Sequence, residues 1–152
     1  MIIVSLQTVF TQYLQQLKQE IAAYQQESNL WKTDRSIKNS AGNLCLHLVG
    51  NLNTYIGKEI GQTNYVRDRE AEFSLKDVPL VELLRMIDET IIVVNTALDK
   101  LDPATLKETY PVLVWDKKTS TEYLLLHLAA HLGYHVGQIS YHRRFVEEPV
   151  TP

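Results

Sequence analysis

Three histidines lie four residues apart near the C-terminal end of the chain, at His127, His131 and His135. An α-helix turns about 100° per residue, so residues four apart share one face, one turn above each other. Imidazoles at this spacing can chelate one divalent cation. The cation needs further ligands, and His47 is the best upstream candidate. The remaining histidine, His142, lies close to the chain end and is expected to be exposed.

The three-histidine stripe has a second interpretation, as a polar seam of hydrogen-bonded core residues. Metal is favoured, because each buried imidazole in a seam would need its own partner and the stripe offers few. Gly133 and Gly137 add weight to this choice. A glycine in a helix interior costs about 1 kcal/mol relative to alanine and usually marks the close approach of another group.

His47 lies in a segment that is rich in asparagine and glycine. Asn43, His47 and Asn51 fall on one stripe of a helix that we expect to begin between Ser36 and Ser40. Asparagine and glycine are poor helix formers, so their density indicates close packing or a polar pocket. Asparagines that merely cap or cross-link helices would give the same pattern. His47 between them favours a site, with Asn43 and Asn51 as pocket candidates.

The periodicity of apolar residues predicts four helices in all, since these residues recur in steps of three and four. The helices are expected at about 3–28, from 36–40 to about 60, at 77–101 and at 119–145. Thr119 and Glu122 form a capping box at the start of the last helix. Ser74 or Asp77 would cap the third, with Pro79 in its first turn.

Two long connections separate these helices, at 61–77 and 102–118, and residues 149–152 form a tail. The run Arg67-Asp-Arg-Glu70 in the first connection is expected on the surface. Connections of this size can run the length of a bundle. The sequence therefore predicts an all-α fold, a four-helix bundle with one or two long connections, as a single domain over 1–152.

Composition restricts the location and the partners. The net charge of −3 gives no attraction to phosphate backbones or anionic lipid, so neither nucleic acid nor a membrane is expected as a partner. The single Cys45 excludes an intrachain disulfide, suits a reducing compartment and is expected to be a small buried hydrophobe. No apolar run approaches about 18 residues and no basic leader is present, so we expect a cytoplasmic protein.

The two histidine segments together resemble the DinB-like (DinB/YfiT) superfamily of small helical bundles. The segments are Asn39-Ser-Ala-Gly-Asn-Leu-Cys-Leu-His47 and His131-Leu-Gly-Tyr-His135-Val-Gly-Gln138. More narrowly, they resemble a branch with an Asn-Ser-x-Gly-Asn-Leu motif in its second helix. The resemblance covers essentially the whole chain in length and helix order, and it implies the same bundle fold and a homodimer.

The resemblance also implies a divalent metal, nickel or zinc, held by His47, His131 and His135. His127 matches no ligand position, so it is expected behind the ligands, in a pocket wall or in the core. The pair His127 and His131 could chelate on spacing alone, but only His135 is followed by Gly-Gln. Gln138 could orient a ligand or line the pocket, or simply pack between helices.

Three neutral histidines leave an open coordination position, where a bound water has its pKa lowered toward about 7 and a thiol loses its proton. Leu132 replaces the general base of an H-E-x-x-H metalloprotease, which disfavours peptide hydrolysis. Similar proteins activate a low-molecular-weight thiol such as bacillithiol, mycothiol or glutathione. The leading prediction is therefore a metal-dependent thiol S-transferase with a small-molecule substrate. The alternatives are a metal-dependent hydrolase and a non-catalytic metal- or partner-binding bundle.

Overall fold

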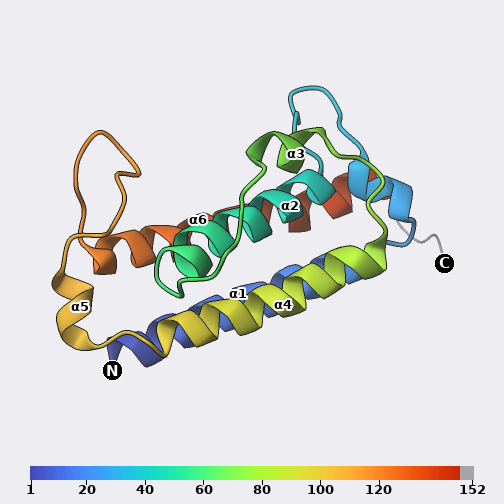
Figure 1. The fold of residues 1–152 in the computed structure, drawn as a ribbon. Helices are drawn as coiled ribbons and strands as arrows, with labels where there is room; N and C mark the ends of the chain where they lie inside the picture. The colour runs from blue at the N-terminus through green and yellow to red at the C-terminus, as the bar shows by residue number, and fades with distance from the viewer. Residues whose placement is uncertain (148–152) are drawn as a thin grey trace.

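Four long helices form the body of the molecule in the computed structural model, which describes residues 1–147 (Figure 1). The chain is all-α within these residues, with two isolated β-bridges and no strand. The predicted tail and the end of the predicted domain, at 148–152, lie outside the described residues. The long helices are α1 (Ile2–Ala22), α2 (Ala41–Leu52), α4 (Leu80–Leu98) and α6 (Thr121–Val146).

The four helices pack pairwise around one apolar core. Helix α1 contacts α4 and α6, and α2 contacts the same two helices from the other side (Figure 1). The core face of α1 shows why, because its five buried residues recur every three or four positions and so form one stripe. They are Leu6, Phe10, Leu14, Leu17 and Ile21. The predicted four-helix bundle is confirmed in its helix order and all-α class.

The second helix begins as predicted, because Ser40 caps it by accepting a hydrogen bond from the backbone N–H of Asn43. It continues beyond Leu52 as a π-helix, η2 (Asn53–Lys58). The first helix is shorter than predicted and ends at Ala22, before a 3₁₀ helix, η1 (Glu27–Trp31). The Trp31 ring lies so close to Gly42 that a Cβ there would stand 2.6 Å from it.

Two predicted caps were wrong. Ser120, not Thr119, caps α6 by accepting from the N–H of Tyr123. The Thr119 carbonyl instead accepts from the N–H of Tyr110, beside the isolated bridge between Thr109 and Ser120. Neither Ser74 nor Asp77 caps α4, whose N-cap is Pro79, because Ser74 ends a preceding short helix and Asp77 has a positive φ of 58°.

Both long connections contain a short helix that the periodicity did not predict. In the first, α3 (Arg69–Ser74) is capped by the Asp68 carboxylate and lies against α2 (Figure 1). In the second, α5 (Pro103–Lys107) is capped by Asp102 and packs on α6. The connection at 61–77 therefore covers the helix that carries His47. No described helix is long and apolar enough to cross a membrane.

Candidate metal centre

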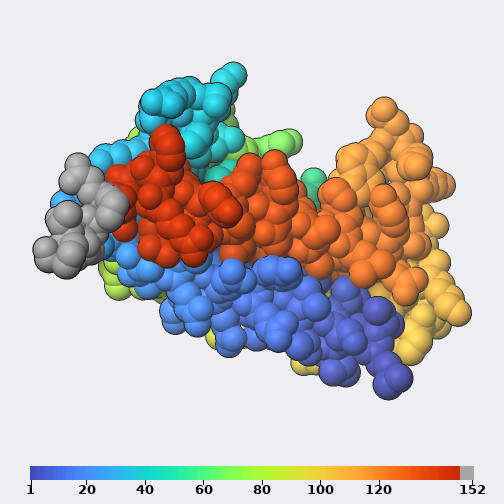
Figure 2. Space-filling model, turned by 180° about the vertical axis from the view of Figure 1, so that it is seen from behind, coloured from blue at the N-terminus to red at the C-terminus, as the bar shows by residue number. Residues whose placement is uncertain are grey.

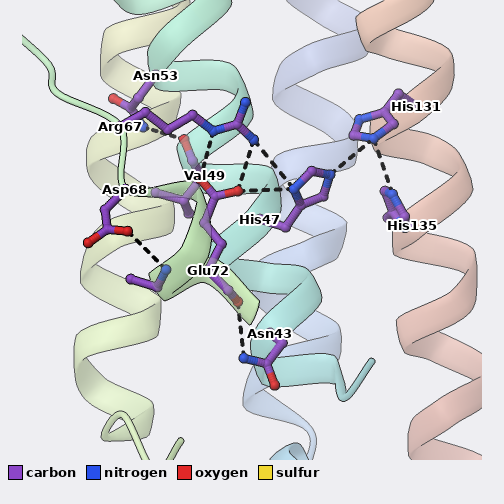
Figure 3. Close-up of polar contacts among 10 residues, drawn as sticks. Asn43, His47, Val49, Asn53, Arg67, Asp68, Glu72, His131 and His135 are labelled. Atoms are coloured by element: carbon purple, nitrogen blue, oxygen red, sulfur yellow. Dashed lines mark hydrogen bonds and ion pairs between the residues drawn. The ribbon is translucent and has the colours of Figure 1, made fainter. Parts of the chain in front are cut away.

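Three imidazole nitrogens converge between α2 and α6 (Figure 3). The Nε2 atom of His131 lies 3.3 Å from Nε2 of His47 and 3.1 Å from Nε2 of His135. One nitrogen from each of the three residues falls within 4.8 Å of the others. In a tetrahedral zinc site with bonds of 2.0–2.1 Å, neighbouring ligand atoms stand about 3.3 Å apart. The three side chains could therefore hold one metal ion.

Two of these imidazoles are fixed through their outer nitrogen. Nδ1 of His47 lies 3.1 Å from Oε1 of Glu72, and Nδ1 of His135 lies 2.7 Å from Oε1 of Gln138. Carboxylate and amide oxygens only accept hydrogen bonds, so Nδ1 carries a proton in both rings, and Nε2 is the nitrogen that the neutral ring offers to a metal. Such partners are typical of metal-binding histidines, because they set the tautomer and the ring orientation.

The Glu72 carboxylate also forms an ion pair with Arg67. Arg67 donates from Nε to Oε2 at 2.7 Å and from Nη2 to Oε1 at 2.8 Å (Figure 3). The side chains of Arg67 and Glu72 are only 14% and 6% exposed, and the guanidinium lies 5.8 Å from the Tyr55 ring centre. Burial alone would raise the pKa of Glu72, but the hydrogen bonds from His47 and Arg67 outweigh it and lower the pKa. The carboxylate is therefore charged and rigidly oriented.

The surface interpretation of the run at 67–70 was wrong for Arg67, because its guanidinium pairs with Glu72, a buried residue of α3, which packs on α2. Glu72 was missed altogether. The available signal was Gly50, three residues after His47, where a Cβ would overlap the Glu72 carboxylate. This glycine lets the carboxylate reach the outer nitrogen of His47 across the surface of α2.

The central imidazole is strongly desolvated. Burial lowers the pKa of His131 to about 4, with the neighbouring His135 and His47 acting in the same direction. Burial also lowers the pKa of His135. Nδ1 of His131 is buried without a hydrogen-bond partner among residues 1–147. Uncharged imidazole is the form that binds metal, so the low pKa of His131 favours metal binding by this ring at neutral pH.

A cavity of about 600 Å³ adjoins the centre at His135. One wall is the last three turns of α6, and the other is the segment 36–39 together with one residue of α2. The lining residues are Ser36, Ile37, Lys38, Asn39, Leu44, Tyr134, His135, Gln138, Tyr141, His142 and Phe145. A site of this size can admit a small organic molecule beside the candidate metal centre.

Comparison with known proteins places the chain in a family. The family model described as "Protein of unknown function (DUF1572)" matches residues 2–149. The chain belongs to the DUF1572 family. No curated protein and no solved structure shows a match to it. The description of the DUF1572 family names no activity.

The other candidates in the DUF1572 chain lie around the triad. His127 is exposed, and its ring stands edge-on to Trp115 with centroids 4.7 Å apart. Asn43 is buried and donates to the backbone carbonyls of Glu72 and Leu75, so it ties α3 to α2 and is absent from the cavity lining. Asn51 is buried, and its Oδ1 has no partner among residues 1–147.

In this DUF1572 protein the structure confirms the predictions for Gly133 and Cys45 and contradicts the one for Gly137. At Gly133, a Cβ would stand 3.1 Å from the Tyr13 ring, which confirms the predicted close approach. At Gly137, nothing lies within 4 Å of that position, so the same interpretation was wrong there. Cys45 is buried as predicted, and burial raises the pKa of its thiol to about 12.

The expectation that His142 is exposed was wrong. Its side chain is buried because the last turns of α6 pack on η1. Nδ1 lies 2.7 Å from the Tyr24 hydroxyl, and Nε2 donates to the Lys32 carbonyl at 2.8 Å. Burial lowers the pKa of His142, and the hydrogen bond to Lys32 offsets only part of this effect.

The buried His142 predicts a pH-dependent stability. In the unfolded chain this imidazole has a pKa of about 6.5, so below that pH the unfolded state binds the proton more readily than the folded state. The free energy of unfolding of EDTA-treated protein should therefore fall as the pH is lowered from about 7 to about 5. Urea titrations of the wild type and of His142→Gln would show a smaller slope in the variant, and equal slopes would contradict the assignment.

Proposed function

We propose that this DUF1572 chain is a metal-dependent enzyme of the DinB-like type, in which His47, His131 and His135 hold zinc or nickel. The observation that carries the proposal is the convergence of three Nε2 atoms, with Nδ1 of His47 and of His135 each engaged by an oxygen acceptor. A polar seam of core histidines would need no such convergence. All-nitrogen donor sets suit zinc and nickel rather than magnesium or calcium.

A zinc or nickel ion bound by three neutral histidines keeps its charge and an open position, and it would lower the pKa of a thiol or water bound there. The chain contributes the orientation of the ligands and a cavity for the substrate. The carboxylate that contacts the triad, Glu72, is engaged by Arg67 on both oxygens, so it is poorly suited to act as a general base. This favours a nucleophile that loses its proton on binding, and we propose thiol S-transfer.

The first test is the metal content of tag-free protein, measured by mass spectrometry. We expect near-stoichiometric zinc or nickel in the wild type and its loss in the double variant His131→Ala, His135→Ala. The matched control is His127→Ala, which removes a histidine of the same stripe outside the triad and should keep the metal. Absence of metal after reconstitution, with no gain in stability on adding zinc, would overturn the proposal.

The second step is a transfer assay on metal-loaded protein, with chlorodinitrobenzene or monochlorobimane as the electrophile. Turnover with bacillithiol, mycothiol or glutathione is expected, and none with the double variant. Turnover of small esters without thiol would instead indicate a hydrolase. Metal binding without any turnover would indicate a binding bundle. Cytoplasmic location and a homodimer stay predictions.

A further inference from the structure

The cavity beside His135 has a composition that selects among small molecules. Its outer wall is aromatic, since Tyr134, Tyr141 and Phe145 all line it from α6. These three side chains are 65%, 75% and 55% exposed, so a ligand would cover apolar surface that is now in contact with water. The space-filling view shows the segment around residue 36 standing against the C-terminal part of α6 (Figure 2).

The two most buried residues that line the cavity, Leu44 and His142, present apolar surface to a ligand. Leu44 is 5% exposed and His142 is 4% exposed. Both nitrogens of His142 are engaged, by the Tyr24 hydroxyl and the Lys32 carbonyl, so its ring presents carbon and π-surface to a ligand. A flat apolar group would therefore meet complementary surface on both sides.

The charge in the cavity has one sign. Lys38 lines the cavity, and no carboxylate does so among the described residues. Lys38 is exposed and forms no ion pair within residues 1–147. Ser36 and Asn39 flank it with groups that can donate hydrogen bonds. The chain as a whole carries a net charge of −3, but the charged side chain that lines this cavity is positive. The cavity therefore favours an anionic ligand.

We infer that the cavity between α6 and residues 36–39 binds the organic substrate of the centre, and that this substrate is a flat apolar or aromatic molecule with an anionic group that pairs with Lys38. The inference rests on the proposed function, because it describes the molecule that is presented to the metal centre. His135 belongs to both sites and therefore places the apolar part of the ligand next to the triad.

A pair of fluorescent probes tests both halves of the inference on the purified full-length chain. Anilinonaphthalene sulfonate carries an aromatic system and an anion, and N-phenylnaphthylamine carries a similar aromatic system without the charge. We expect saturable binding of both at one site. Tyr141→Ala should weaken both probes, because it removes a cavity wall while alanine maintains the helix.

Lys38→Met should weaken only the sulfonate probe, by about threefold or more, as expected for an exposed ion pair. The matched control is Lys107→Met, an exposed lysine of α5 at the other end of the molecule, which should change neither affinity. The inference is overturned if neither probe saturates, if Lys38→Met leaves sulfonate binding unchanged, or if it weakens both probes equally.

His131→Ala separates this inference from the metal proposal, because His131 is a triad residue that does not line the cavity. Probe binding should survive in this variant while metal is lost. Protein that binds both probes as expected but never binds metal would overturn only the metal proposal. Protein that binds metal but no probe would overturn only the cavity inference.

Discussion

Glu72→Ala is expected to lower the free energy of unfolding by about 3–5 kcal/mol, because it leaves the largely buried Arg67 guanidinium without its counter-ion. The same change removes the acceptor of the His47 Nδ1–H, so metal affinity should also fall by about 10–100-fold. Urea denaturation measures the first effect, and competition with a chromophoric chelator measures the second.

The matched control for this variant is Glu70→Ala, which removes an exposed carboxylate from the same short helix. Its stability should stay within about 0.5 kcal/mol of the wild type. The double variant Glu72→Ala, Arg67→Met should recover part of the lost stability, since the uncompensated charge is gone, but not the metal affinity. Recovery of metal affinity in the double variant would show that Glu72 does not orient His47.

Gly50→Ala should destabilise the protein although alanine is the better helix former. The new Cβ would overlap the Glu72 carboxylate, which Arg67 and His47 hold in place. Forcing extra volume into a packed site costs about 1–3 kcal/mol, and displacement of Glu72 adds the loss of the ion pair. Thermal denaturation and metal titration should both show the loss.

Gly137→Ala, on α6, is expected to change the stability in the opposite direction to Gly50→Ala. Because nothing lies within 4 Å of a Cβ at Gly137, only helix propensity acts there, and stability should rise by about 1 kcal/mol. Equal changes in the two variants would mean that the fit of Glu72 against Gly50 does not contribute to stability.

The spacing of the histidines predicts only part of the candidate site, because it places His127, His131 and His135 on one helix face. The choice of His131 and His135 came from the family resemblance, through the Gly-Gln that follows His135. His131 and His135 share a helix face by their spacing alone, and the apolar periodicity around them fixes that helix. The prediction of His47 needed only the assumption that its helix packs against the helix that carries His131 and His135. The all-α class followed from the same periodicity.

Glu72 and Arg67 could not be predicted in the same way. A charged residue in a polar connection has the same pattern whether it is solvated or folded inward, and the choice depends on the path of residues 61–77 in space. His142 shows the same limit, since closeness to the chain end says nothing about what packs on it. The N-cap of α6 lies one residue from the predicted one, at Ser120, which also forms an isolated bridge with Thr109.

Helix α3 has only six residues, and a helix this short does not persist in water by itself. Its order depends on the Asp68 cap, on the two carbonyls held by Asn43 and on the ion pair of Glu72. A short helix at the surface of a bundle opens locally at a free energy below that of global unfolding. Each such opening would withdraw the acceptor from His47 while the four long helices stay assembled. The time for which His47 stays oriented is therefore set by local opening of α3 rather than by global unfolding of the four-helix bundle.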